Sequence, residues 1–326
     1  MTTGLFGLDE LAQAARIIEA SMAPTPQLCW PLLSDAVGTE VWVKHENHTP
    51  IGAFKVRGGL VHLQRLAREP VPPAGVISAT RGNHGQSLAF AARVTGTTAV
   101  VVVPEGNNPE KNAAMRALGA EVVVAGVDFD QARGHAAALA EQRGLALVPS
   151  FHRDLVLGVA TYAAELLAKV ADLDTVYVPV GMGSGIAGLI TVRDLLGLRT
   201  EIVGVVAEGA PAYAHSYTAG RIQTTDRVDT FVDGVACREP DPDAFALILR
   251  GAARLLTVPD DQTAQAMRLM LRATHNLTEP AGAIGLAGLL QERDRQRARR
   301  VAVILTGGNV DAPTLVAVLA GQTPTA

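Results

Sequence analysis

Residues 44–59 read KHENHTPIGAFKVRGG and place one lysine, Lys55, among small and apolar residues where a helix is expected to begin. Burial in such surroundings disfavours the charged form of a lysine and makes its proton easier to lose. A neutral lysine amine is the nucleophile that forms Schiff bases with carbonyl groups. A lysine on the first turn of a helix is usually a surface residue. The interpretation of Lys55 therefore depends on what accompanies it along the chain.

The composition favours buried parallel strands that are covered by helices. Hydrophobic residues make up 48% of the 326 residues and charged residues only 18%, with small aliphatic side chains dominating. Such a chain suits an α/β protein of two domains rather than one small core. The net charge of -4, with both signs interspersed, lacks the basic footprint of a protein that binds nucleic acid or an anionic membrane. We expect neither partner.

Several features point to a cytoplasmic protein. Residues 1–20 have no basic segment followed by an apolar core, so they predict an amphipathic helix that begins near Asp9 rather than a signal peptide. No apolar run is long enough to span a bilayer. Cys29 and Cys237 have no metal-ligand spacing, and we expect both to be reduced thiols.

Short β-branched runs alternate with Ala/Leu-rich stretches along the chain. Strands are predicted at 41–44, 76–79, 99–103, 121–124, 145–148, 175–180, 202–207 and 301–305. Helices are predicted at 86–94, 110–118, 132–142 and 155–170. This rhythm indicates mainly parallel sheets, whose ligand sites lie at the carboxyl ends of the strands. The proline-rich residues 70–73 and the turn at 149–150 predict a small domain, 75–150, inserted into a large one formed by 1–74 and 151–326.

Residues 78–86, SATRGNHGQ, follow one predicted strand and open a helix. A helix start offers free N–H groups and the positive end of a dipole, which suits a carboxylate, and Asn83 could donate to a phenolate or phosphate oxygen. The alternative is a capped turn in which Gly82 and Gly85 only supply unusual backbone dihedrals. The segment alone leaves both interpretations open.

Two more strand-to-helix junctions carry polar groups. Residues 179–185, PVGMGSG, have closely spaced glycines whose backbone N–H groups could surround a phosphate, with Ser184 adding a hydroxyl. This pattern is weak alone, and it lacks the acidic residue near position 203 that a nicotinamide enzyme needs. Residues 306–309, TGGN, follow the last predicted strand. Thr306 there could offer a neutral hydroxyl to a ring nitrogen or simply cap a helix.

A lysine nucleophile, a phosphate loop, a carboxylate-binding helix start and a hydroxyl at a strand end together indicate pyridoxal 5'-phosphate (PLP) and an amino acid. The chain resembles the serine/threonine dehydratase family of fold-type II PLP enzymes over nearly its whole length. The resemblance implies a two-lobed α/β fold of the tryptophan synthase β type, with parallel-rich sheets flanked by helices. It also implies a small amino-acid substrate and a homodimer.

The family's motifs assign roles to residues of this chain. Lys55 matches the lysine of a Ser-Phe-Lys motif that carries the cofactor as a Schiff base, although Ala53 replaces the serine. Asn83 matches the asparagine of a Gly-Asn-His motif that bonds the cofactor's 3'-oxygen. The resemblance implies that the cofactor is bound by Lys55, Phe54, Asn83, Gly181, Met182, Gly183, Ser184, Gly185, Glu279 and Thr306. It implies that the substrate is bound by Thr80, Arg81, Gly82, Asn83 and His84.

Four of these positions can be compared directly with the family's motifs: two differ from the motif and two match it. Met182 and Ser184 replace two glycines of the family's tetraglycine phosphate loop. Thr306 falls where relatives place serine, cysteine or threonine beside the pyridine nitrogen, and Glu279 matches a motif near the ring.

Arg81 departs from the family pattern, because relatives carry alanine or serine before Gly-Asn-His. In the related racemases that serine delivers a proton, for which an always-charged guanidinium is a poor substitute, so we do not expect racemase activity. Arg81 is either solvated and ion-paired, or it pairs with the substrate carboxylate, the phosphate or a second acidic group of the substrate.

Other polar residues are expected to be structural. Glu208 stands where relatives begin a divalent-cation site, but position 214, where a second acidic ligand would stand, is Ala214. We therefore expect no bound metal. His45, His48 and His84 are interpreted as parts of loops and helix starts, outside the catalytic set.

These residues predict a PLP-dependent lyase that dehydrates a 3-hydroxy amino acid of the threonine or serine type to a 2-oxo acid and ammonia. Lys55 is the expected base for the α-proton. The 3-hydroxy amino acid and its stereochemistry stay open, with 3-hydroxyaspartate and phenylserine among the candidates. Two alternatives also stay open: β-replacement of the cysteine synthase type, and a non-catalytic protein that binds PLP or an amino acid.

Overall fold

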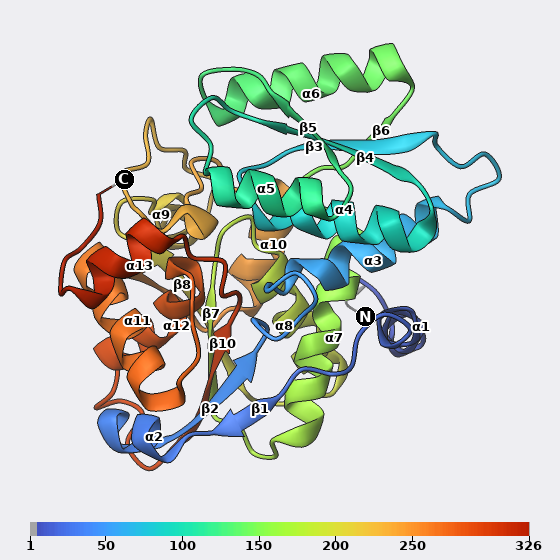
Figure 1. The fold of residues 1–326 in the computed structure, drawn as a ribbon. Helices are drawn as coiled ribbons and strands as arrows, with labels where there is room; N and C mark the ends of the chain where they lie inside the picture. The colour runs from blue at the N-terminus through green and yellow to red at the C-terminus, as the bar shows by residue number, and fades with distance from the viewer. Residues whose placement is uncertain (1–4, 326) are drawn as a thin grey trace. The chain divides into compact units, whose positions relative to one another are not determined.

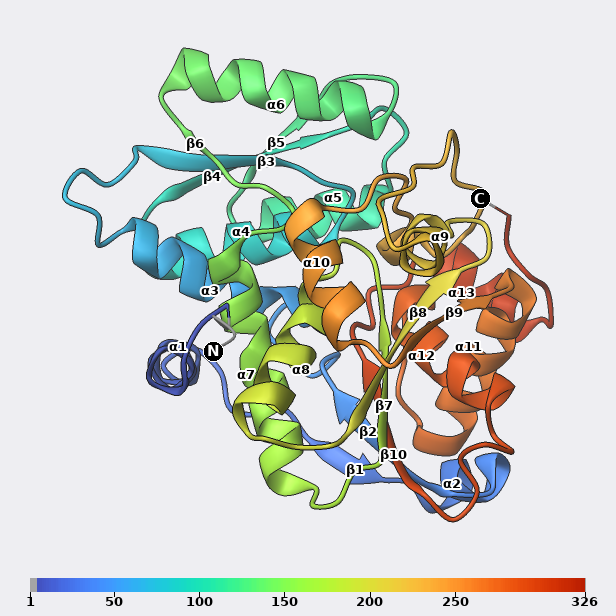
Figure 2. The same ribbon diagram turned by 180° about the vertical axis from the view of Figure 1, so that it is seen from behind.

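Residues 5–325 are described by a computed structural model, and they divide into two compact units. The larger unit contains Pro24–His48 and residues 160–325, together with residues 5–8. The smaller unit contains Asp9–Ala23 and Thr49–Val159. Each unit is built around one sheet, and Figures 1 and 2 show the elements from opposite sides.

The larger unit has a six-stranded sheet of order β1-β2-β10-β7-β8-β9. Its strands are β1 (Gln27–Cys29), β2 (Glu40–His45), β7 (Thr175–Pro179), β8 (Glu201–Ala207), β9 (Arg254–Val258) and β10 (Arg300–Leu305). Only β1 is antiparallel to its neighbour. His45 pairs with Leu305 in the register of β2 and β10, and the N–H of Glu46 donates to the Leu305 carbonyl at 2.9 Å. Since the strands are parallel, the loops after β2, β7 and β10 leave from the same edge.

Helices cover both faces of this sheet. They are α2 (Pro31–Val37), α8 (Ser184–Leu195), α9 (Ala212–Ala219), α10 (Pro242–Gly251), α11 (Asp260–Thr274), α12 (Pro280–Gln291) and α13 (Ala312–Leu319), with the 3-10 turn η1 (Asp233–Val235). α12 and α11 lie on one face, and α8 and α10 lie on the other (Figures 1 and 2).

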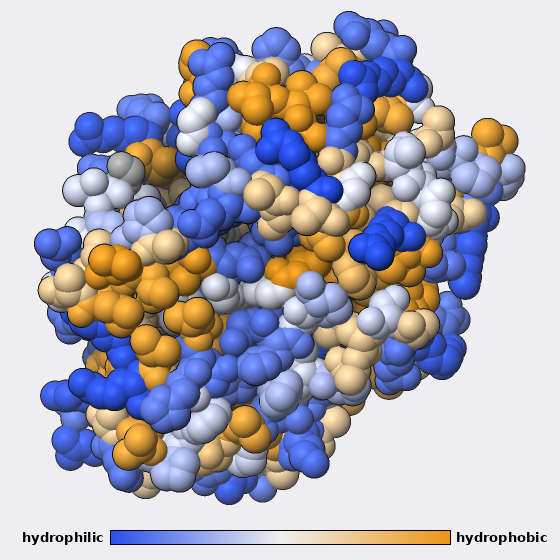
Figure 3. Space-filling model, in the orientation of Figure 1, coloured by the Kyte–Doolittle hydropathy of each residue, from blue (hydrophilic) through white to orange (hydrophobic). Residues whose placement is uncertain are grey.

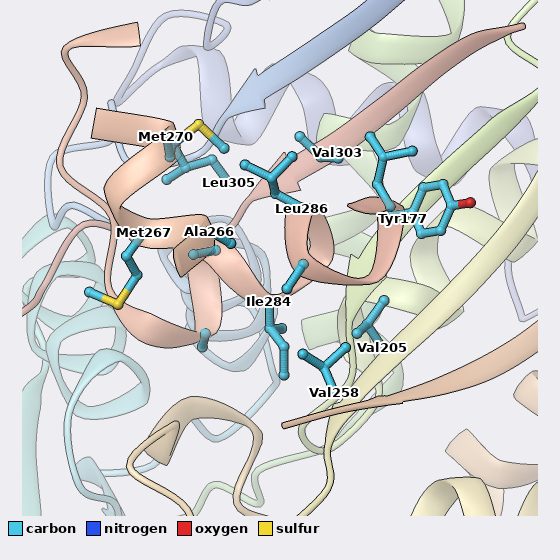
Figure 4. Packing of buried hydrophobic residues seen from close by; sticks show 14 of the residues in the cluster. Tyr177, Val205, Val258, Ala266, Met267, Met270, Ile284, Leu286, Val303 and Leu305 are labelled. Atoms are coloured by element: carbon cyan, nitrogen blue, oxygen red, sulfur yellow. The ribbon is translucent and has the colours of Figure 1, made fainter. Parts of the chain in front are cut away.

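The core of the larger unit lies between α12 and the sheet. Figure 4 shows Ile284 and Leu286 of α12 among Tyr177, Val205 and Val303 of the strands, and all five side chains are fully or almost fully buried. Burying an aliphatic side chain of this size stabilises a fold by about 2 kcal/mol. Every residue of α12 from Pro280 to Leu289 is buried, which explains why its sequence is apolar on all sides.

The smaller unit has a four-stranded sheet of order β5-β4-β3-β6, and all its pairs are parallel. Its strands are β3 (Gly75–Ala79), β4 (Thr98–Val103), β5 (Glu121–Val124) and β6 (Ala146–Leu147). Its helices are α1 (Leu8–Glu19), α3 (Lys55–Leu66), α4 (Asn83–Thr95), α5 (Pro109–Ala117) and α6 (Phe129–Arg143), and α7 (Arg153–Lys169) continues into the larger unit. α6 covers one face of the sheet and α4 the other (Figure 1).

The structure confirms the α/β fold class and the predicted strands and helices. It adds two edge strands that the sequence did not predict, β1 and β9. The smaller unit is wider than the predicted segment 75–150, because α3 packs closely against α4. A Cβ added to Gly59 of α3 would lie 2.3 Å from the Ser87 hydroxyl of α4. The division at 75 and 150 itself stays a prediction.

The surface carries some apolar side chains. Over α13, Val316 is 67% exposed and Leu319 is 51% exposed, and apolar side chains gather in this region in Figure 3. Among the described residues, no helix combines the length and the apolar character that crossing a membrane requires. Cys29 is exposed, Cys237 is buried, and both are free thiols.

Candidate active site

The predicted phosphate loop lies in the larger unit between β7 and α8. Gly183 has a φ of 91°, in the left-handed region that favours glycine. A Cβ on Gly181 would lie only 2.5 Å from the carbonyl oxygen of Gly234. No side chain caps the start of α8. A helix start of this kind offers its first N–H groups to an anion, so the loop suits a phosphate.

Tyr213 of α9 holds this loop in place. Its hydroxyl donates to the carbonyl of Met182 at 3.2 Å and accepts the N–H of Asp241 at 3.1 Å. Burial strongly raises the pKa of Tyr213, so the hydroxyl keeps its proton and stays a donor. Beside the loop, burial also raises the pKa of Cys237 to about 11, and its sulfur lies 3.7 Å from the Met182 sulfur as a neutral thiol. The local sequence gave no signal for Tyr213.

Glu279 and Thr306, predicted to lie near the cofactor ring, are brought together in the same unit. Each is 3% exposed. The N–H of Glu279 donates to the carbonyl of Gly307 at 3.0 Å, directly after Thr306. A Cβ on Gly282 in the first turn of α12 would lie 2.6 Å from the same carbonyl. The start of α12 therefore packs on the turn that follows β10.

Gly234 of η1 connects this pair to the phosphate loop. Its carbonyl faces Gly181, and a Cβ on Gly234 itself would lie 2.6 Å from the Cβ of Ala281 in α12. The phosphate loop, Glu279 and Thr306 thus occupy one region of the larger unit. The role of Gly234 could not be predicted from the sequence, because its only signal there is a single glycine between Asp233 and Val235.

Lys55 is the first residue of α3 in the smaller unit, as predicted. The Thr49 hydroxyl fixes the turn before it, because it accepts the N–H of Ala53 and donates to the Ala53 carbonyl, both at 2.9 Å. The Lys55 Nζ lies 5.2 Å from the ring centroid of Phe54. Lys55 is half-buried rather than enclosed, whereas the next two residues of the same turn are fully buried. The Ser87 hydroxyl donates to the Lys55 carbonyl at 2.6 Å.

Asn83 is the first residue of α4 in the same unit. Ser87 lies one turn further along α4, so its bond to Lys55 brings the starts of α3 and α4 together. Thr80 is buried, and its hydroxyl accepts the N–H of Gly82 at 3.1 Å. Asn83 and Lys55 thus occupy one region of the smaller unit.

His84 and Arg81 flank this helix start and differ in burial. His84 is 8% exposed; burial first, and then nearby Lys55, lower its pKa to about 3, so the imidazole is neutral. Its buried Nε2 has no hydrogen-bond partner within residues 5–325. Arg81 is exposed and makes no hydrogen bond or ion pair with the residues that the structure describes. The residues predicted to bind the substrate therefore include buried ones, such as His84, and an exposed one, Arg81.

The remaining polar residues have structural surroundings. Glu208 is exposed after β8, and Ala214 is buried. His45 accepts the indole N–H of Trp30 at 2.9 Å, and burial lowers its pKa to about 4. His48 shares a hydrogen bond of 2.6 Å with the Asn276 side chain. His45 ends β2, and His48 belongs to the loop that follows it.

A protein-family model described as pyridoxal-phosphate dependent enzyme matches residues 18–307. The chain belongs to this family. It is 35% identical over 287 residues to L-threonine ammonia-lyase of Geobacter sulfurreducens, covering 88% of this chain and 71% of that one. It is 30% identical over 314 residues to L-threo-3-hydroxyaspartate ammonia-lyase of Saccharomyces cerevisiae, covering 96% of each.

Solved structures of this PLP family have the same fold. The processed form of threonine deaminase isoform 2 from Solanum lycopersicum matches with a TM-score of 0.88 at 31% identity, covering 98% of this chain and 95% of that one. The fold-type II resemblance and the PLP cofactor inferred from the motifs are confirmed.

The residues of the chain fit PLP. In the larger unit, the start of α8 has no side-chain cap and offers its first backbone N–H groups, and Gly181 lets the loop pack against Gly234, which suits the phosphate. The buried hydroxyl of Thr306 suits the pyridine nitrogen. In the smaller unit, Lys55 offers an amine on a turn that Thr49 and Ser87 hold by hydrogen bonds.

Proposed function

We propose that this protein is a PLP-dependent ammonia-lyase that converts a 3-hydroxy amino acid to a 2-oxo acid and ammonia by α,β-elimination. The relatives named threonine and 3-hydroxyaspartate ammonia-lyase support this reaction, and they give no support to β-replacement or to a binding-only role. The observation that carries the proposal is the buried Thr306 at the end of β10. When bound, PLP supplies an electron sink, which a neutral hydroxyl at its nitrogen weakens enough to favour prompt elimination.

Each part of the chain has a distinct role in this proposal. The Nζ of Lys55 holds the cofactor and takes the α-proton of the substrate. The start of α8 binds the phosphate through its backbone and Ser184, and Asn83 donates to the cofactor's 3'-oxygen. The residues that shape the cofactor site are Phe54, Gly181, Met182, Gly183, Gly185 and Glu279. The residues that receive the substrate carboxylate are Thr80, Gly82, Asn83 and His84.

Lys55→Ala tests the anchor and the base together. We expect the purified variant to lose the visible absorbance band of the bound cofactor and kcat to fall by roughly 10³-fold, within the range for a general base. Lys169→Ala, which removes an exposed lysine from the last turn of α7, is the matched control and should keep both properties. An unchanged visible band in Lys55→Ala would disprove the assignment.

The proposal extends to substrate choice through Arg81. We infer that its guanidinium pairs with an acidic β-substituent of the substrate. Its exposure without a partner supports this inference, and so does a second cation beside the same loop. A Cβ on Gly82 would lie 2.9 Å from the Lys111 side chain, so Lys111 of α5 lies next to the residue that follows Arg81.

Substrate competition tests this inference. Arg81→Ala should lower kcat/KM for 3-hydroxyaspartate by about 10-fold to 100-fold, as expected for losing a charge-assisted hydrogen bond, and should change threonine and phenylserine far less. Arg93→Ala, an exposed arginine at the other end of α4, is the control. Unchanged ratios between the three substrates would remove Arg81 from substrate selection.

The family resemblance also supports a homodimer as part of the proposal, and the cytoplasmic location expected from the sequence is proposed with it. Light scattering after size exclusion measures the assembly, and the mass of a single chain would contradict the dimer. Fractionation of the source cells tests the location.

A further inference from the structure

Two histidines and an aspartate lie together in the smaller unit, and neither the cofactor nor the substrate role has been assigned to any of the three. His62 is on α3, His152 immediately precedes α7, and Asp154 is in the first turn of α7. The His62 Nδ1 lies 3.6 Å from Asp154 Oδ2, and the His152 Nδ1 lies 3.8 Å from the same oxygen. One potential metal-ligating atom from each residue lies within 4.8 Å of the others.

These separations are close to those of a metal site. Zinc binds imidazole nitrogens and carboxylate oxygens at about 2.0–2.2 Å in a tetrahedral arrangement, which puts neighbouring ligand atoms roughly 3.3–3.5 Å apart. The two measured distances to Asp154 exceed this range by a few tenths of an ångström. The two imidazole nitrogens lie within 4.8 Å of each other, so rotations of the His62 and His152 rings would also have to bring this third pair closer to reach ligation distance.

His62 provides the observation that points to a ligand. It is 6% exposed, and its buried Nδ1 has no hydrogen-bond partner within residues 5–325. Leaving a buried polar nitrogen unsatisfied destabilises a fold, so such atoms call for a specific explanation. A cation between the Nδ1 of His62 and the Asp154 carboxylate would satisfy it.

His152 has the lone pair that ligation needs. Its Nδ1 accepts the backbone N–H of Asp154 at 3.2 Å, so this nitrogen carries no proton. The His152 side chain is 42% exposed, which gives an ion a route from solvent. A bound ion would replace the backbone donor, whose N–H would then bond to water.

The charges around Asp154 leave one oxygen for the ion. Arg65 donates to Oδ1 at 2.5 Å, and Arg153 lies 3.7 Å from the same oxygen. This arrangement orients Oδ2 toward the histidines, as hydrogen-bonded outer groups orient metal-ligating carboxylates. Glu10 pairs with both arginines, at 2.7 Å from Arg153 and 3.4 Å from Arg65, and offsets part of their positive charge.

We propose that His62, His152 and Asp154 form a zinc site of two imidazoles and one carboxylate, with the fourth position open to water. The site ties α3 to the start of α7. It is independent of the proposed ammonia-lyase reaction. Without zinc, the same residues would form only an ion-pair cluster at the start of α7, and the experiment separates these cases.

Equilibrium dialysis of the PLP-loaded protein against Zn²⁺, after treatment with a chelator, tests the site. We expect wild type to bind about one tightly held zinc ion per chain and its Tm to rise with zinc. His152→Ala should weaken binding by more than about 10-fold, because losing a ligand costs at least as much as losing an outer-shell partner. His135→Ala, an exposed histidine of α6 in the same unit, should bind like wild type.

Asp154→Asn is the second variant, in case His152→Ala is unstable. Loading with Co²⁺ gives a spectroscopic signature, as a visible difference spectrum between wild type and either variant. Equal zinc binding by wild type, His152→Ala and Asp154→Asn would overturn the proposal, and so would no tight binding by wild type. Either failure would leave ammonia-lyase turnover intact, which distinguishes it from failure of the proposed function.

Discussion

The start of α8 in the larger unit and the start of α4 in the smaller unit occupy equivalent places after a strand but have different neighbours. Both follow a parallel strand and contain glycines beside the residues proposed to bind anionic groups. At α8, a Cβ on Gly181 would meet the backbone oxygen of Gly234 at 2.5 Å. At α4, a Cβ on Gly82 would meet a carbon of the flexible Lys111 side chain at 2.9 Å. A backbone held in a packed fold cannot yield, whereas a long side chain can, so the fold fixes the close approach at Gly181 but not the one at Gly82.

The largest effect is expected from Gly181→Ala. The added methyl group has to displace η1, whose Gly234 also packs on α12, so we expect a loss of about 3 kcal/mol in the free energy of unfolding. The displaced phosphate loop should also release PLP on dialysis. Urea unfolding and the visible absorbance of the dialysed protein measure the two effects.

Gly134→Ala is the control for this substitution. A Cβ at Gly134 of α6 meets nothing within 4 Å, so alanine there should be neutral or slightly stabilising. If Gly181→Ala kept the stability and the cofactor of wild type, the backbone near η1 would be mobile, and the difference between the two loops would disappear.

A second prediction concerns a feature that the two units share. Each has a buried neutral histidine beside its loops: His45 at the end of β2, with a pKa of about 4, and His84 in α4, with a pKa of about 3. Both values lie below the 6.5 of an ordinary histidine, mainly because of burial. Below pH 6.5 the unfolded chain therefore binds protons that the folded chain does not.

The stability from each histidine is fully present above pH 6.5, falls as the pH drops toward the folded pKa, and levels off below it. Between pH 6.5 and pH 5 each should cost about 2 kcal/mol. We expect His45→Gln and His84→Gln each to flatten the loss of unfolding free energy between pH 7 and pH 5, measured with urea, and the exposed His135→Gln to leave it unchanged. A flattening in only one variant would show that the two units do not bury their histidines alike.

Most of the fold could be predicted from the sequence because its signals are local. The runs at 99–103 and 301–305 are continuously apolar, as buried parallel strands are, and the stretches between strands have helical composition. β1 and β9 were missed because both are edge strands with incomplete burial, so neither has a continuous apolar pattern. Their pairing depends on β2 and β8 rather than on their own residues.

The candidate site was predictable as a set of segments but not as a set of contacts. The motifs around Lys55 and Ser184 fall at helix starts, as predicted. Gly234 and Tyr213 support the phosphate loop from distant parts of the chain, and no spacing in the sequence links them to it. The burial of each residue in the loop before α4 also depends on distant parts of the chain, because other elements cover the neighbours of Arg81 but leave Arg81 exposed.

The smallest effect is expected from Gly82→Ala, and it tests the flexible side of the comparison. The new methyl group meets Lys111, which can rotate away, so we expect a loss of no more than about 1 kcal/mol and a retained visible PLP band. Adding Lys111→Ala should remove most of that loss, because two residues in contact are energetically coupled. Urea unfolding of the single and double variants measures this coupling. If Gly82→Ala lost as much stability as Gly181→Ala, and the double variant did not recover it, the backbone around Gly82 would be as rigid as the backbone around Gly181. The start of α4 could then adapt to different substrates no better than the phosphate loop could adapt to a different anion.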